Sequence, residues 1–179
     1  MNKWILRRPL VTALLLLTVS FPQRGFADAG AGVGAGASFG QGRTSLSVFG
    51  GSGSAFGQSY FVLGVGANYY VIQGLGLGVN FESWLGNTPG MYKLTPNVQY
   101  VFTLIPSVQP YVGVFYRRAF IEDLSDLNSV GIRGGAYLPV GHNTHFGLGG
   151  VYEKYLDCNQ STYNSCDDFY PEISFTVSF

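Results

Sequence analysis

The sequence predicts an all-β chain that closes into an eight-stranded antiparallel up-and-down barrel and crosses a membrane with its strands. Three observations carry this prediction: strict alternation in the last segment, an export signal at the N-terminus, and a composition rich in aromatic residues but poor in charge. Aromatic residues make up 16% of the chain and charged residues 11%. A strand of a transmembrane barrel gives a much weaker signal than a transmembrane helix, so the three observations are taken together.

The last segment, residues 169–179, alternates without a break. Its apolar positions are Phe169, Pro171, Ile173, Phe175, Val177 and Phe179, and the residues between them are Tyr170, Glu172, Ser174, Thr176 and Ser178. Successive side chains of a strand point to opposite faces, so one face is wholly apolar and the other is polar. We expect the apolar face to meet lipid and the polar face to meet the lumen.

The N-terminus has the pattern of a secretory signal. Lys3, Arg7 and Arg8 precede an apolar core over 10–19, which is too short to span a bilayer. The sequence predicts a signal peptide over 1–27, with cleavage after residue 29 as an alternative. A Gly/Ala-rich segment then covers 28–42 and either extends the first strand or stays disordered, and the barrel covers 43–179.

The charge of the exported chain excludes one class of partner. The whole chain has ten basic and ten acidic residues. Four basic residues leave with the signal, so six basic and ten acidic residues remain, a net charge of −4 if Asp28 is kept. Nucleic acid is therefore not an expected partner, because binding to phosphate requires an excess of cations.

Alternation bounded by turn residues predicts eight strands. They cover 43–50, 59–71, 75–85, 91–102, 110–118, 128–138, 144–155 and 169–179. An even number of strands puts both termini on one side, the periplasmic one. Short turns at 72–74, 103–109 and 139–143 then lie on that side, and longer extracellular loops cover 50–58, 86–90, 119–127 and 156–168.

With these strands, the chain resembles the small eight-stranded outer-membrane barrels of Gram-negative bacteria, of the OmpX and OmpA N-terminal type. The specific element is the terminal strand, in which Phe175, Val177 and Phe179 match the signal that such proteins present to the barrel-assembly machinery. The resemblance implies a protein of the cell outer membrane with both termini periplasmic. It also implies outer-membrane lipid and lipopolysaccharide as surroundings, the assembly machinery as a partner, and a monomer.

Six charged residues have inward parity, three of each sign: Glu82, Lys93, Arg117, Arg133, Glu153 and Glu172. Hairpin register puts Glu82 beside Lys93, but it also puts Arg117 beside Arg133 and Glu153 beside Glu172. Two like-charged neighbours would repel, so we expect the arginines to pair with glutamates across the lumen. An eight-stranded barrel is only wide enough for its side chains to fill it, which favours a charged plug over a conduit.

Arg118, Asn128 and Lys154 have outward parity near one level at the extracellular rim. Their expected ligand is the phosphate of lipopolysaccharide, and the alternative is that they are snorkelling residues at strand ends. Cys158 and Cys166 are expected to form a disulfide in the last loop, because an exported protein meets an oxidising compartment.

Catalysis is not expected. The two histidines, His142 and His145, fall at the periplasmic turn before the seventh strand, and no serine, histidine and carboxylate come together there. No cofactor and no metal site are predicted. The expected role is structural or a surface interaction; a narrow channel or transporter for small or hydrophobic molecules, and an adhesin acting through its loops, are the alternatives.

Overall fold

The computed structural model describes residues 38–55, 58–156 and 166–179. They belong to one compact unit, residues 32–179. The predicted signal peptide and its two cleavage sites lie outside the described residues, as does most of the 28–42 segment. Within the described ranges, no helix is long and apolar enough to cross a membrane.

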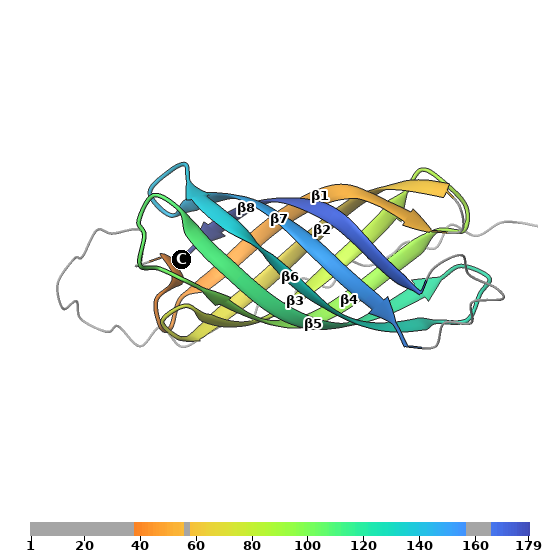
Figure 1. The fold of residues 1–179 in the computed structure, drawn as a ribbon, viewed down its shortest axis with the longest axis horizontal. Helices are drawn as coiled ribbons and strands as arrows, with labels where there is room; N and C mark the ends of the chain where they lie inside the picture. The colour runs from red at the N-terminus through yellow and green to blue at the C-terminus, as the bar shows by residue number, and fades with distance from the viewer. Residues whose placement is uncertain (1–37, 56–57, 157–165) are drawn as a thin grey trace, which may run out of the picture. The chain divides into compact units, whose positions relative to one another are not determined.

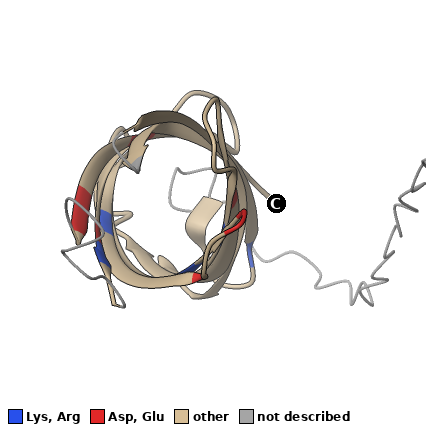
Figure 2. Ribbon diagram, turned by 90° about the vertical axis from the view of Figure 1, so that its right-hand side faces the viewer, with Lys and Arg blue, Asp and Glu red and all other residues tan. Residues whose placement is uncertain are grey.

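Eight antiparallel strands close into a barrel in which each strand pairs with its sequence neighbours and β1 pairs with β8 (Figures 1 and 2). The strands are β1 (Thr44–Ala55), β2 (Gln58–Ile72), β3 (Leu75–Leu85), β4 (Met91–Val101), β5 (Gln109–Ile121), β6 (Leu127–Pro139), β7 (Thr144–Tyr155) and β8 (Asp167–Ser178). The predicted fold class is confirmed. A closed sheet has no free edge, so every strand satisfies its backbone groups on both sides.

The two ends of the barrel differ. One end, called the terminal end below, holds the start of β1, the end of β8 and the connections 73–74, 102–108 and 140–143. There Thr44 and Phe179 exchange two backbone hydrogen bonds, of 3.2 and 2.8 Å. The opposite end, called the loop end, holds the other four connections.

β1 and β5 extend furthest beyond their predicted ends at the loop end. β1 and β2 stay paired as far as Ala55 and Gln58, so the predicted loop 50–58 is wrong. The Gly/Ser-rich stretch after Phe49 lacks an apolar alternation, but its backbone groups pair all the same. β5 likewise continues to Ile121, into the predicted loop 119–127.

Residues 38–43, called the N-terminal strap below, do not extend β1. They form a short turn, and Phe39 within them is completely buried. The carbonyl of Phe39 accepts a hydrogen bond of 2.8 Å from the Gly74 amide in the β2–β3 turn. The strap therefore enters the terminal end of the lumen before the chain joins the wall.

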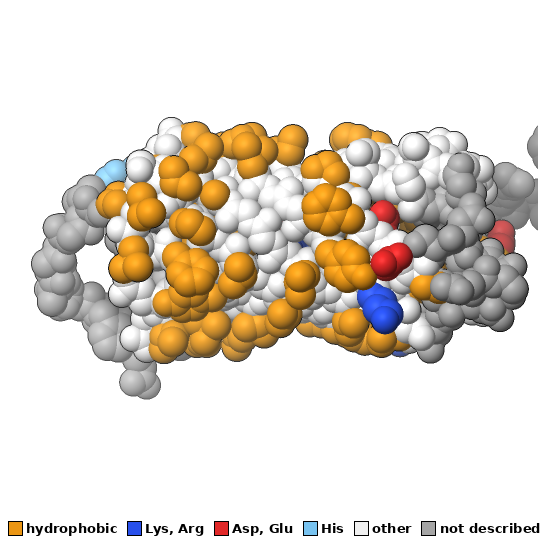
Figure 3. Space-filling model, viewed as in Figure 1, with side chains coloured by type: hydrophobic (Ala, Val, Ile, Leu, Met, Phe, Trp, Pro, Cys, Tyr) orange, Lys and Arg blue, Asp and Glu red, His pale blue; other side chains and the backbone are white. Residues whose placement is uncertain are grey.

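The two faces of the wall are inverted relative to a water-soluble protein. Apolar side chains such as Phe61, Val65 and Val112 are more than half exposed on the outer face, while charged side chains such as Arg117 and Glu153 are fully buried inside. On the face drawn in Figure 3, apolar side chains are spread along the barrel, and most of the visible charged side chains lie towards one end. Strict alternation along β4 and β5 produces this inversion.

Candidate functional site: the charged lumen

The six predicted lumen residues all lie inside the barrel. Their exposed fractions are 1% for Glu82, 1% for Lys93, 0% for Arg117, 7% for Arg133, 0% for Glu153 and 8% for Glu172. They come from β3, β4, β5, β6, β7 and β8, one residue from each strand. Buried charges need partners, and the geometry of those partners determines what the lumen can do.

Arg117 is the centre of the main cluster. Its guanidinium donates to Glu82 Oε1 at 2.5 Å and to Glu153 Oε2 at 2.6 Å. It also donates to Thr95 Oγ1 at 2.9 Å and to Tyr170 Oη at 2.5 Å. The four partners lie on β3, β7, β4 and β8, so one side chain connects opposite walls of the barrel.

Glu153 is the second centre of this cluster. Besides Arg117, it accepts hydrogen bonds from Ser129 Oγ at 2.5 Å and from Tyr170 Oη at 3.2 Å. The Lys93 ammonium lies 3.7 Å from Glu153 Oε2. The two carboxylates of Glu82 and Glu153 thus face two cations, and the cluster is neutral as a whole.

Lys93 stands between the ionic cluster and an apolar layer towards the loop end. Its ammonium lies 3.8 Å from the centre of the Trp84 ring, a cation–π contact. Trp84 packs with Tyr60, Val62, Met91, Ala119 and Ile121 into one buried group. This apolar layer lies on the loop-end side of the charges.

A second, looser pair lies nearer the terminal end. Arg133 and Glu172 approach to 3.6 Å. The ring of Phe115 lies between the two clusters, 4.7 Å from the Arg117 guanidinium carbon and 5.2 Å from that of Arg133. The lumen is therefore filled in layers of ionic and aromatic side chains.

The register corrects two of the predicted neighbours. Glu82 does pair with Lys93 on adjacent strands. Arg117, however, stands opposite Ser129, with Arg133 four residues further along β6. On the next hairpin, Glu153 faces Asp168 and Glu172 faces Gly149. Parity determines only whether a side chain points inward or outward. Its position along the barrel axis depends on the strand register, which the first ladder pair beside each loop determines. The two predicted like-charged pairs are therefore not ladder neighbours, but Glu153 stands opposite a different carboxylate, that of Asp168.

The predicted rim residues make contacts of their own. Arg118 donates to Asp126 Oδ2 from Nε at 3.1 Å and from Nη2 at 2.7 Å. Asn128 Oδ1 accepts a hydrogen bond of 2.6 Å from the Tyr116 hydroxyl. Lys154 is exposed on β7 and stands beside Asp167 of β8. The Arg118 guanidinium is more than half exposed, so it can still meet a second anion.

His145 lies within β7 and is buried in the lumen at the terminal end, whereas His142 lies in the preceding turn. In the part of the chain that the structure describes, no three His, Cys, Asp or Glu residues are grouped as metal ligands are. The predicted disulfide involves Cys158, which lies outside the described residues, and it stays a prediction.

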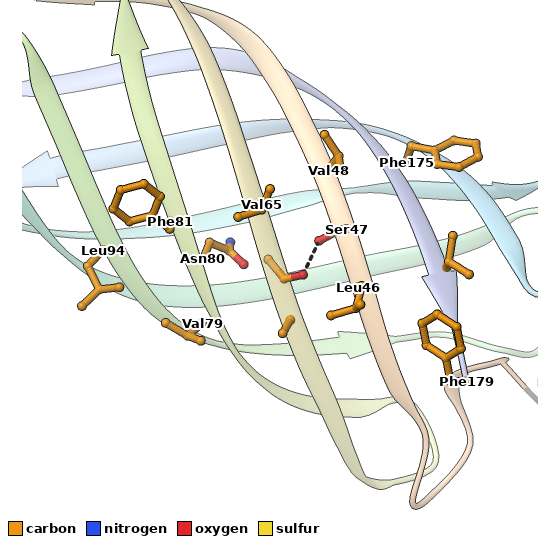
Figure 4. A pocket seen from close by; sticks show the side chains of 13 residues that line it. Leu46, Ser47, Val48, Val65, Val79, Asn80, Phe81, Leu94, Phe175 and Phe179 are labelled. Carbon is orange, nitrogen blue, oxygen red and sulfur yellow. Dashed lines mark hydrogen bonds between the residues drawn. The ribbon is translucent and has the colours of Figure 1, made fainter. Parts of the chain in front are cut away.

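A groove on the outer wall runs over β1, β2, β3, β4 and the end of β8 (Figure 4). The groove follows Gly66 and Ala67, the smallest residues of this part of β2, and Ser47 Oγ donates to the Gly66 carbonyl at 3.5 Å. None of its lining residues is charged. Its surface therefore offers contacts to hydrocarbon and no reactive group.

Sequence reasoning did not single out Thr95, Ser129 and Tyr170, which complete the ionic cluster. All three have inward parity. Thr95 is two residues from Lys93, Tyr170 is two residues from Glu172, and Ser129 stands opposite Arg117 in the ladder. Inward polar residues at the level of buried charges are the signal that identifies such partners.

No protein-family model matches the sequence, and no curated protein matches it. Among solved structures, the N-terminal β-barrel domain of Pseudomonas aeruginosa OprF is similar, with a TM-score of 0.63 and 14% identity over 78% of this chain and 99% of that one. Neisserial surface protein A (NspA) has a TM-score of 0.52 and 19% identity over 76% of this chain and 94% of that one.

The chain has the fold of the small eight-stranded outer-membrane barrels. The resemblance read from the terminal strand predicted this fold. At such identities the likeness concerns the fold alone, because one fold hosts many activities.

Proposed function

We propose that the protein is an integral outer-membrane barrel with a structural or surface-interaction role, whose lumen is closed by its own paired charges. The observation that carries this proposal is the cluster around Arg117, which joins Glu82 and Glu153 across the barrel. The side chains of all three residues are almost completely buried. A pore would need a continuous polar path, and the buried ion pairs of this cluster support a closed lumen.

The outer face supports the membrane location. Exposed apolar side chains lie on the outer face of every strand, and, among the described residues, the charged side chains outside the lumen lie at the loop end except for Arg43. Water-soluble monomers rarely expose apolar patches of this size, whereas a lipid-facing wall requires them. With both termini on the periplasmic side, the acidic loop end faces the exterior.

Planar-bilayer conductance tests the closed lumen. The expected result is no stepwise current from the wild-type protein, and none from Glu122→Gln, a charge removal in an exposed connection. Reproducible single-channel steps from the wild type that change in size with Glu82→Gln or Arg117→Ala would overturn the proposal in favour of a narrow channel. Both cluster variants are compared only after heat-dependent gel migration shows that they are folded.

Contact with lipopolysaccharide is the surface interaction that the rim favours. Arg118 and Lys154 are exposed cations on the loop-end half of the outer wall, and hydrogen bonds to charged groups contribute about 1.5–3 kcal/mol each. The test is retention of purified lipopolysaccharide by detergent-solubilised protein. Lys154→Gln combined with Arg118→Gln should reduce retention several-fold, while Arg43→Gln, at the terminal end, should not. Equal retention by all three proteins contradicts the contact.

A further inference from the structure

Phe39 lies inside the barrel although it belongs to no strand. Its ring centre is 5.4 Å from that of Tyr70, 5.3 Å from that of Tyr137 and 4.7 Å from that of His145. These three side chains, together with Tyr111, are called the aromatic cage below. Phe39 is completely buried within this cage, at the terminal end of the lumen.

The cage is built by the wall and not by the strap. Tyr111 and Tyr137 stack at 4.6 Å with an angle of 25° between their planes. Two glycines on neighbouring strands leave room for the rings. A Cβ atom at Gly76 would lie 3.0 Å from the Tyr70 ring, and one at Gly147 would lie 3.0 Å from the Tyr137 ring. The rings can therefore lie flat along the wall and leave a slot between them.

The strap is attached to the wall by few bonds. The Phe39 carbonyl accepts from the Gly74 amide, and the Gly42 amide donates to the Tyr70 carbonyl, both at 2.8 Å. The Arg43 carbonyl accepts from the Tyr70 amide at 2.9 Å. Gly42 and Gly74 each have φ of 80°, a conformation that favours glycine. No ladder pair of β1 includes Phe39. Phe39 can thus leave the cage without unpairing the barrel.

His145 adds a polar requirement that Phe39 does not meet. The side chain is 1% exposed, and its Nδ1 has no hydrogen-bond partner among the described residues. A buried polar atom without a partner is costly, and a phenylalanine ring can neither donate nor accept in its place. An aromatic group with a hydrogen-bonding substituent would satisfy both the stacking surfaces and this nitrogen.

We propose that the aromatic cage is a binding site for a flat aromatic molecule with one hydrogen-bonding substituent, of the phenol or indole class. In the present structure Phe39 of the strap occupies the site as a tethered competitor. The site opens when the strap withdraws, and it closes again when Phe39 returns. This proposal is independent of the role of the charged cluster nearer the loop end.

Phenol binding to a Phe39→Ala variant in detergent micelles tests the proposal. An emptied apolar cavity of this kind binds small aromatic molecules. Phenol should raise the thermal midpoint of Phe39→Ala in a saturable way and leave the wild type unchanged, because the tethered ring keeps its own site filled. Benzene should give a smaller shift than phenol, and His145→Leu in the same background should remove that difference.

Phe169→Ala is the matched control, since it deletes an outward phenylalanine that is 72% exposed and opens no cavity. Equal phenol shifts in the wild type, Phe169→Ala and Phe39→Ala would mean partitioning into micelles and would overturn the proposal. The absence of any shift in Phe39→Ala would overturn it as well. If that variant does not fold, Phe39→Leu replaces it with the same criteria, because leucine removes the ring but keeps apolar volume.

Discussion

Arg117 Nη1 and Glu153 Oε2 meet at 2.6 Å in the middle of the lumen, from strands β5 and β7 that are not neighbours in the sheet. Both side chains are fully buried. Their contact therefore passes through the lumen on the inner side of β6 and does not join adjacent strands. Removing either charge leaves the other in a medium of low dielectric constant, which is the basis of the first prediction.

Glu153→Gln should destabilise the barrel by about 3–5 kcal/mol, the usual cost of breaking a buried ion pair. Glutamine keeps the volume, but Arg117 and Lys93 would then share the single carboxylate of Glu82. Urea titration followed by heat-dependent gel migration measures the change in the free energy of unfolding. Glu122→Gln is the control and should change it by less than about 0.5 kcal/mol. Equal stabilities of the two variants would mean that water reaches the cluster.

The pair Arg133 and Glu172 should respond differently to single and double replacement. Arg133→Met alone leaves the Glu172 carboxylate buried without its partner. It should lower the free energy of unfolding by about 3–5 kcal/mol, as in other buried pairs. Replacing both residues, with Glu172→Leu added, should restore most of that loss, because a buried pair can often be exchanged for apolar residues at little cost. A double-mutant cycle on urea midpoints checks this. Strict additivity of the two single changes would contradict a direct interaction.

The sequence predicted whether a side chain points inward or outward more reliably than its position along the barrel axis. Parity alone assigns Glu82, Lys93 and Arg117 to the lumen, because a strand repeats every two residues. The opposition of Arg117 to Ser129 depends on where β5 ends, and the continuation to Ile121 has no compositional signal. Register therefore lay beyond the reach of alternation.

Phe39 could not be predicted for a different reason. It follows a Gly/Ala-rich stretch with no period of two, so no pattern assigns its ring to either face. Its burial depends on tertiary fit to Tyr70 and Tyr137, which lie far along the chain. The inward position of His145, by contrast, follows from parity, because the predicted strand 144–155 has the same start as β7.

Phe179→Ala should impair assembly in cells more than stability in micelles. Phe179 is 61% exposed, and its backbone bonds to Thr44 do not depend on its side chain. If the terminal strand is the signal for the assembly machinery, the amount of folded protein in outer-membrane fractions falls several-fold. Refolding from urea into detergent should be nearly unchanged. Phe81→Ala, an outward aromatic change in β3, should affect neither; a similar fall in cells would contradict a specific terminal signal.

Cys158 and Cys166 should form an intramolecular disulfide in the exported protein. The measurement is the intact mass of the protein before and after reduction. Reduction should increase this mass by that of two hydrogen atoms. Cys158→Ser should lower stability by roughly 2–3 kcal/mol, because the bond limits the unfolded chain over a short loop. Cys166→Ser should give the same loss, and the double variant no more than either one. Two free thiols in protein isolated without reductant would contradict the pairing.

Gly134 and Gly135 of β6 should differ sharply in their tolerance of a methyl group. A Cβ atom at Gly135 would lie 2.6 Å from Gly149 Cα and closer still to the Leu148 carbonyl oxygen, both parts of the neighbouring backbone. Neither can move without opening the β6–β7 ladder. Gly135→Ala should therefore lower the free energy of unfolding by about 1–3 kcal/mol or more, the range typical of an overpacked core.

Gly134→Ala is the matched control on the adjacent residue. There the nearest atom to the added Cβ is the Tyr111 carbonyl oxygen at 3.5 Å, an ordinary van der Waals contact on the outer face. Alanine should be neutral or stabilising by about 0.4–1 kcal/mol, because it restricts the unfolded chain. Urea midpoints of the two variants check the difference. A Gly135→Ala barrel as stable as Gly134→Ala would mean that β6 and β7 can separate locally, and that the close approach of these strands does not hold the barrel shut.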